Sequence, residues 1–175
     1  MTPNTTLVRF AFVFAVAFAL QFAAFEASRG SSFEKIVIDD LTLTPTATLI
    51  NWFAPAEAIR VDGRSLTTSN SVLRITRGCE GVEMLLLLTA GILAFPTSTR
   101  HRARGFCVGL VIVYALTIAR LVLLHFTLRY CPHAWNMLHG LVLPLGPVLL
   151  IALYFLHWSA AGTKMAQRTE ALHGT

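Results

Sequence analysis

The long apolar segments of this chain constrain its fold more than any other feature. A helix needs roughly 20 apolar residues to cross the hydrocarbon core of a bilayer, which is about 30 Å thick. Four segments approach or meet this length, at residues 7–25, 80–96, 106–128 and 135–158. A soluble core does not require such runs. The sequence therefore predicts an all-α integral membrane protein with four transmembrane helices, forming a single domain over residues 1–175.

The amount and placement of charge support the same conclusion. Charged residues make up 13% of the chain, about half of the roughly 25% found in an ordinary soluble domain. The net charge of +5 does not indicate binding to nucleic acid, because the basic residues flank the apolar segments. In that position they act as topology signals or contact anionic lipids.

The basic residues also predict how the helices are oriented. The loop at residues 97–105 contains three arginines and a histidine, and the C-terminal tail carries Lys164 and Arg168. The positive-inside rule places both in the cytoplasm. With four spans the N-terminus is then cytoplasmic too. Residues 26–79 and the short turn at 129–133 are expected to face outward.

The first and fourth apolar segments each have a special feature. The first, residues 7–25, also has the short polar start of a cleaved signal peptide. Its length favours a retained anchor, and the segment that follows faces outward in both cases. The fourth contains Pro144 and Pro147, and proline removes a helical hydrogen bond. We therefore expect a kink or local unwinding there.

The outward segment, residues 26–79, is predicted to contain secondary structure of its own. Residues 33–53 carry apolar side chains at mixed spacing and are interrupted by Pro45, which predicts a short helix lying on the membrane surface. Residues 58–76 alternate around an Asp-Gly pair and a middle rich in Ser, Thr and Asn. That pattern predicts a small β-hairpin. A disordered loop is the alternative.

Three polar residues near or within the spans are the best candidates for chemistry. Ionisable groups at membrane depth are costly, so they are functional candidates by default. Cys79 opens the second span, Arg120 lies about eight residues inside the third, and His139 lies one turn into the fourth. The predicted topology places all of them in the outer half of the membrane, although they come from three different helices.

These side chains form a coherent chemical set. A cysteine is nucleophilic as the thiolate, which a helix N-terminus and nearby cations favour. His139 would take the thiol proton and later protonate a leaving amine. Arg120 would hold the thiolate or an oxyanion, where one good donor is worth roughly 3 kcal/mol. Glu80 and Glu83 oppose the stabilisation of a thiolate at Cys79.

Other interpretations of the cysteines and the arginine remain open. Cys79 and Cys131 are both predicted on the oxidising side, so they could form a disulfide. Cys107 is interpreted as a small packing residue near the cytoplasmic end of its helix. Arg120 could instead extend to the outer surface, although a depth of about 12 Å makes that difficult.

The histidine assignment is also open on spacing alone. His125 and His133 lie on the same predicted side of the membrane as His139. Periodicity does not choose among the three.

The order of these elements resembles the exosortase/archaeosortase family, in a short, subtype-specific form. Gly78-Cys79-Glu80-Gly81 precedes an apolar helix that ends in Ala94-Phe95-Pro96, and a basic loop, an arginine and a histidine follow. The resemblance covers about residues 74–158. It implies a membrane transpeptidase with Cys79 as nucleophile, Arg120 as the family's arginine and His139 as its histidine. Thr117 stands where the family often has asparagine, and additional spans of larger members are absent.

The resemblance implies a specific activity. The protein would be a cysteine protease and transpeptidase of the bacterial cytoplasmic (inner) membrane. It would cleave the C-terminal sorting signal of exported, membrane-anchored proteins at the outer face. The signal's helix would dock beside the fourth span, and a thioester on Cys79 would be resolved by a second nucleophile.

The sequence also bears on cofactors and on rival functions. No metal or organic cofactor is expected, because no His, Cys, Asp or Glu cluster has metal spacing. The rival interpretation is a non-catalytic transport or assembly subunit with a structural Cys79 and an anion-binding Arg120. A serine or metal-dependent intramembrane protease lacks its motifs.

Overall fold

The computed structural model describes residues 3–68, 72–75 and 81–173. It is mostly helical, with one small antiparallel sheet. Among the described residues, three helices are long and apolar enough to cross a membrane. They are α1 (Pro3–Ala27), α5 (Thr99–Tyr130) and the helical segment Pro132–Lys164.

The second apolar segment forms a shorter helix than its neighbours. Helix α4 (Val82–Ala94) has 13 residues, which extend about 20 Å at about 1.5 Å per residue. It begins after Gly81 and ends at Phe95, which is extended. Proline disfavours helical geometry in the residue before it, so Pro96 explains this end. Helix α4 lies in the centre of the bundle, in contact with α1, α5 and α7.

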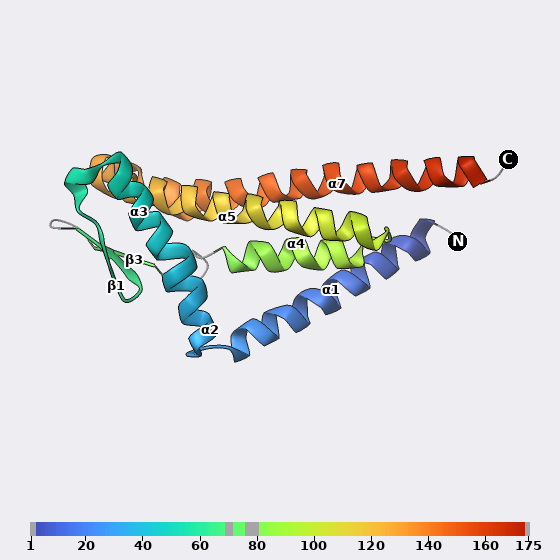
Figure 1. Ribbon diagram of the computed structural model, residues 1–175, viewed down its shortest axis with the longest axis horizontal. Coiled ribbons are helices and arrows are strands. Elements are labelled where there is room, and N and C mark those ends of the chain that lie inside the picture. The colour runs from blue at the N-terminus through green and yellow to red at the C-terminus, as the bar shows by residue number, and fades with distance from the viewer. Residues whose placement is uncertain (1–2, 69–71, 76–80, 174–175) are drawn as a thin grey trace.

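The helices form a bundle whose two ends differ. Helices α4, α5 and α7 (Leu143–His173) run side by side, while α1 touches α4 near its own start and then diverges (Figure 1). The first turns of α1, the loop between α4 and α5 and the C-terminal part of α7 lie at one end, here called the basic end. The sheet and the helix that follows α1 lie at the other, here called the sheet end.

The fourth apolar segment changes its helical type before its prolines. It consists of η3 (Pro132–Ala134), α6 (Trp135–Met137), the π-helical η4 (Leu138–Val142) and α7. Proline cannot donate to the carbonyl four residues earlier, and its ring crowds that carbonyl. A wider turn directly before Pro144 accommodates both effects. A π-helical segment thus precedes the two prolines, and α7 continues through both of them, where a kink or local unwinding was predicted.

The helix that was predicted to lie outside the membrane, here called the outward helix, runs without a break through Pro45. It is built from α2 (Ser32–Lys35), the π-helical η1 (Ile36–Leu43) and α3 (Thr44–Phe53). The prediction of an interruption at Pro45 is wrong. Pro45 stands in the first turn of α3, directly after η1, so its missing N–H leaves one carbonyl of the preceding turn without its helical donor.

Threonine hydroxyls add hydrogen bonds to this π-helical stretch. Thr42 Oγ1 donates to the carbonyl of Val37 at 2.8 Å, and Thr44 Oγ1 donates to that of Asp39 at 3.0 Å. Each bond reaches back five residues, which matches the wider π-helical turn. These two bonds reinforce η1 just before Pro45, and the helix continues through the proline.

The sheet has one strand more than the predicted hairpin. Strands β1 (Arg60–Asp62), β2 (Ser65–Thr67) and β3 (Val72–Arg74) pair antiparallel in the order β1-β2-β3. Leu66 pairs with Val61 on one side and with Leu73 on the other. The sequence analysis assigned β2 to the turn-rich middle, because Leu66 is its only apolar residue.

Two apolar clusters form the core. The sheet-end cluster joins the outward helix, the sheet and the outer part of α5 through Ile38, Leu43, Ala47, Ile50, Ile59, Leu66, Leu73, Ile75, Leu121, Leu124 and Leu143. The bundle cluster joins α4, α5 and α7 through Met84, Leu88, Ile92, Val113, Ile151 and Trp158. The outward helix is therefore fixed to the end of α5 as well as to the sheet.

Candidate functional site

The start of α4 is packed directly against α5. Cys79 itself lies outside the described residues, and the nearest described residue after it is Gly81. Gly81 has a φ of +75°, and a Cβ at this position would collide with Thr117 Oγ1. A side chain is therefore excluded both by the backbone conformation and by the close approach. The contact fixes the start of α4 beside the middle of α5.

Arg120 is buried in α5, one helical turn beyond that contact. It is only 7% exposed, and Thr117 and Leu124 share its buried face. A side chain extended to the outer surface would be much more exposed, so the burial argues against that alternative. A guanidinium offers several N–H donors in a fixed plane, which suit a carboxylate or another oxyanion.

Thr117 uses its hydroxyl differently from the asparagine that the resemblance would place there. Its Oγ1 donates to the carbonyl of Val113 at 2.9 Å, within its own helix. The hydroxyl hydrogen is therefore committed to the backbone. Thr117 instead provides the surface on which Gly81 rests.

His139 lies in η4, on a helix that adjoins the same part of α5. Its ring stacks on that of Trp135, with centroids 5.0 Å apart and an angle of 14° between the planes. Its Nδ1 is buried and has no hydrogen-bond partner within the described part of the chain. The preceding Leu138 packs on the cluster that contains Leu121, the residue after Arg120. Both candidate residues therefore lie on adjacent helices toward the sheet end.

The structure separates His139 from the two rival histidines. His133 is exposed in η3. His125 is 1% exposed, and its Nε2 lies 3.7 Å from Oε2 of Glu57. His125 therefore faces a carboxylate, although its Nε2, like Nδ1 of His139, is buried without a hydrogen-bond partner among the described residues.

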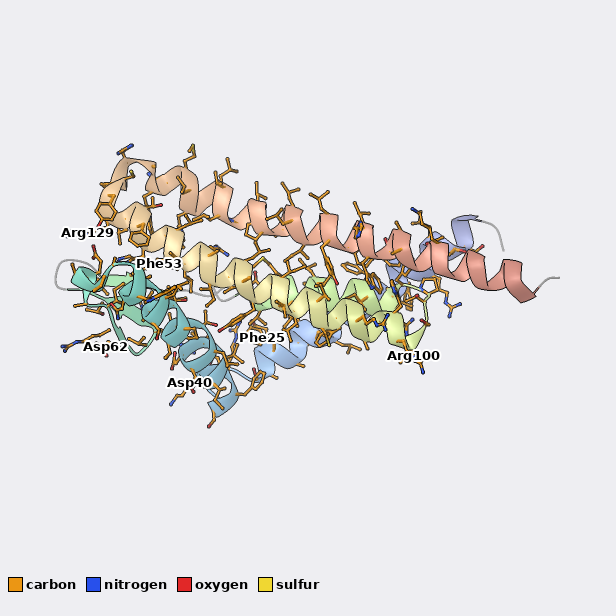
Figure 2. All side chains as sticks on the ribbon, turned by 45° about the horizontal axis from the view of Figure 1, so that its top comes forward. Phe25, Asp40, Phe53, Asp62, Arg100 and Arg129 are labelled. Atoms are coloured by element: carbon orange, nitrogen blue, oxygen red, sulfur yellow. The ribbon has the colours of Figure 1, made fainter. Side chains whose placement is uncertain are left out.

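Glu57 is the centre of a polar cluster that the sequence analysis did not find. It lies in η2 (Pro55–Glu57), just after α3. Its Oε1 accepts a hydrogen bond from Arg129 Nε at 3.3 Å and one from Tyr130 Oη at 3.2 Å. Together with His125, these residues are called the Glu57 cluster. It fastens the outward segment to the end of α5 that carries Arg129 (Figure 2).

A second buried carboxylate stabilises the same end of the molecule. Glu34 is 4% exposed and accepts a hydrogen bond from the backbone N–H of Gly30 at 2.7 Å. It also pairs with Arg64 at 2.8 Å, which joins the outward helix to the turn between β1 and β2.

The two described cysteines are free thiols. Cys131 is exposed and is not in a disulfide, so the structure lacks the alternative pairing with Cys79. Cys107 is also exposed, and its predicted packing role is wrong. The close-packed positions of this part of α5 are Gly105 and Gly109, which meet Trp158 and Leu88 respectively.

An apolar cavity of about 440 Å³ adjoins the Gly81–Thr117 contact. It lies between η1, the start of α4 and the middle of α5, and its walls include Leu41, Leu85 and Val111. A cavity with this lining suits an apolar segment.

Within the described ranges, no group of three or more His, Cys, Asp or Glu side chains could hold a metal ion. No family model, curated protein or solved structure matches this chain.

Proposed function

We propose that the chain crosses the bacterial cytoplasmic membrane four times, with the basic end inside. Both ends of the described chain and the loop between α4 and α5 lie at one end of the bundle, as an even number of crossings requires (Figure 1). Helix α4 is short for a crossing, but it is surrounded by α1, α5 and α7. Non-helical backbone at its ends is tolerated where protein surrounds it.

We propose that the protein is a membrane-embedded cysteine protease and transpeptidase that acts on C-terminal sorting signals. The contact between Gly81 and Thr117, one turn from the buried Arg120, carries this proposal. Cys79 is two residues from Gly81 in the sequence, which supports its assignment as the nucleophile that works with Arg120.

The proposed reaction uses each of the three residues once. His139 takes the proton from the Cys79 thiol, and the thiolate attacks the carbonyl carbon of the scissile peptide bond. Arg120 stabilises the oxyanion that forms. The C–N bond then breaks, the imidazolium protonates the leaving amine, and the basic tail of the substrate departs. An amine, hydroxyl or water attacks the remaining thioester and restores the free thiol.

The cavity beside Gly81 suggests where the substrate lies. An apolar helix of the sorting signal would occupy the space between η1, α4 and α5, with its outer end near Cys79. This position replaces the expectation that the substrate docks beside the fourth span. Leu85→Trp should fill the cavity and impair cleavage while leaving the reactivity of Cys79 unchanged.

Thiol reactivity tests the catalytic assignment without knowledge of the substrate motif. The chain has three cysteines, so the variant C107A/C131A retains only Cys79. We expect it to react with maleimide at pH 7 at least tenfold faster than C79A/C107A, which retains the exposed Cys131. Arg120→Gln and His139→Gln should each slow the reaction of Cys79.

Trapping of the intermediate supplies a second readout. In cells that express the C107A/C131A variant, protein adducts on Cys79 should be released by hydroxylamine, as thioesters are. His133→Gln, which alters an exposed histidine, serves as the control. A Cys79 that reacts no faster than Cys131, is indifferent to Arg120→Gln and carries no such adduct would favour the non-catalytic subunit instead.

A further inference from the structure

The basic end of the bundle contains a cavity of about 360 Å³ whose lining is mostly apolar but includes two arginines and two threonines, and it is here called the polar cavity. It lies between the first turns of α1 and the connection from α4 to α5. Arg9 and Thr6 line it from α1, and Arg102 and Pro96 line it from the opposite side. Two guanidinium side chains from separate helices thus share one cavity.

Arg102 is held beside this cavity by a hydrogen bond to the backbone. Its Nη2 donates to the carbonyl of Phe95 at 2.9 Å, which holds the guanidinium in place. Its Nε is buried and finds no acceptor among the residues that the structure describes. The Nε–H is covered by protein, so the donors that Arg102 could offer to a ligand in the cavity are the terminal N–H groups of its guanidinium that the bond to Phe95 does not use.

Among the described residues, no carboxylate lines the cavity. In the whole sequence, every acidic residue except Glu170 falls between positions 26 and 83, and none of the lining residues is acidic. Arg102 also lies in the first turn of α5, where the helix dipole adds positive potential. The cavity therefore selects an anion.

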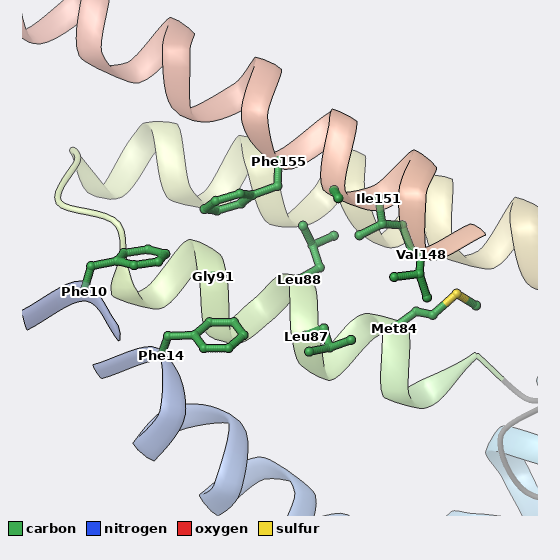
Figure 3. A pocket seen from close by; sticks show the side chains of 10 residues that line it. Phe10, Phe14, Met84, Leu87, Leu88, Gly91, Val148, Ile151 and Phe155 are labelled. Atoms are coloured by element: carbon green, nitrogen blue, oxygen red, sulfur yellow. The ribbon is translucent and has the colours of Figure 1, made fainter. Parts of the chain in front are cut away.

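An apolar cavity of about 320 Å³ adjoins the polar one. Phe10 lines both cavities. Figure 3 shows Phe10 and Phe14 of α1 opposite Leu87 and Gly91 of α4, with Phe155 of α7 close by. This lining is almost wholly apolar and suits a hydrocarbon chain.

We propose that the polar cavity binds the phosphate of an anionic phospholipid headgroup and that the apolar cavity takes part of an acyl chain. A guanidinium binds phosphate oxygens through several N–H donors, and threonine hydroxyls supply further donors. Lipid is favoured over free phosphate because the cavity lies at the end of apolar helices, next to the apolar cavity. The inference requires a membrane-spanning chain but does not depend on peptidase activity.

The lipid would link α1 to the rest of the bundle. Helix α1 packs mainly against α4 and diverges from the bundle beyond it (Figure 1). A headgroup held by Arg9 of α1 and Arg102 of α5 would bridge the two helices on the side that α4 leaves open. Anionic lipid should therefore stabilise the contact between α1 and the bundle.

Native mass spectrometry of the detergent-solubilised full chain tests the proposal. We expect phosphatidylglycerol to be retained at least tenfold more than phosphatidylcholine at equal concentration. Arg9→Gln/Arg102→Gln should abolish this preference. The matched control is Arg100→Gln/Arg104→Gln, which removes the same charge from exposed positions at the same end, outside the cavity lining.

The comparison has outcomes that overturn the proposal. An equal loss of preference in the control variant would show diffuse attraction instead of a built site. Full competition by millimolar inorganic phosphate would indicate a free-phosphate site. Because Arg102→Gln also removes the bond to Phe95, Arg9→Gln alone must reduce the preference, while Arg9→Lys/Arg102→Lys must retain most of it. Cys79 reactivity is unaffected in every case, so failure here is distinct from failure of the peptidase assignment.

Discussion

The two ends of the bundle handle their charges in opposite ways. At the sheet end, buried Glu34 and Glu57 are paired with cations from distant parts of the chain, among them Arg64 and Arg129. At the basic end, Arg102 bonds a backbone carbonyl and lines a cavity whose walls contain no carboxylate. At the sheet end, the buried carboxylates are therefore paired within the chain. At the basic end, the proposed anionic lipid would supply the negative partner of the arginines.

The largest expected effect is on thioester formation, and it should differ between two arginines of α5 that lie toward different ends of the bundle. Arg120→Gln should reduce thioester formation by roughly 10² to 10³, because it removes the proposed oxyanion donor. Arg102→Gln should change thioester formation by no more than about twofold, since Arg102 lies at the basic end, away from the proposed site. The measurement is the amount of hydroxylamine-released adduct per unit of folded protein. Equal losses in both variants would contradict the assignment of Arg120.

Glu57 should carry the next largest effect, on stability. Glu57→Gln removes a buried charge that faces His125, Arg129 and Tyr130, and we expect a loss of roughly 2 kcal/mol. Arg129 is partly exposed, so its pair contributes little of this. The loss is measured as the change in the free energy of unfolding in mixed detergent micelles. Glu83→Gln, at an exposed position, should change it by less than about 0.5 kcal/mol.

A glycine substitution probes the packing of the basic end. A Cβ at Gly105 would collide with the indole of Trp158, which stacks on His101 at 4.8 Å and donates to its carbonyl at 3.2 Å. Gly105→Ala should therefore cost roughly 1 to 2 kcal/mol of unfolding free energy. Gly146→Ala meets no atom within 4 Å and should be neutral or slightly stabilising. A neutral Gly105→Ala would mean that α5 and α7 are loosely joined at this end.

The fold was predictable from sequence wherever apolar length or local chemistry decides the structure. Three of the apolar segments form helices of spanning length, as expected, and the prolines of the fourth are preceded by a π-helical turn. The continuous helix through Pro45 was not predictable, because proline alone favours a break and no local pattern indicates the π-helical stretch before it. Strand β2 was missed since Leu66 is its only apolar residue, and its burial arises from pairing on both sides.

The candidate site was predictable only in part. Arg120 is buried, as its position in the span suggested. The Glu57 cluster joins residues about 70 positions apart, and no local pattern connects such residues. His139 was chosen by resemblance, and only the structure distinguishes it from His125, which faces Glu57. Cys79 lies outside the described residues, so its position in the site stays a prediction.

The smallest expected effect is the loss of stability when the exposed hydrogen bond of the Glu57 cluster is removed. Tyr130 donates to Glu57 at 3.2 Å, but its ring is 64% exposed. Water can replace such a bond, so Tyr130→Phe should cost only about 0.5 kcal/mol of unfolding free energy. Tyr114→Phe, on an exposed tyrosine in the middle of α5, is the control and should be neutral. If Tyr130→Phe lowers the unfolding free energy by more than about 2 kcal/mol, the exposed hydrogen bond of Tyr130 stabilises the sheet end as much as the buried pair of Glu57 and His125 does.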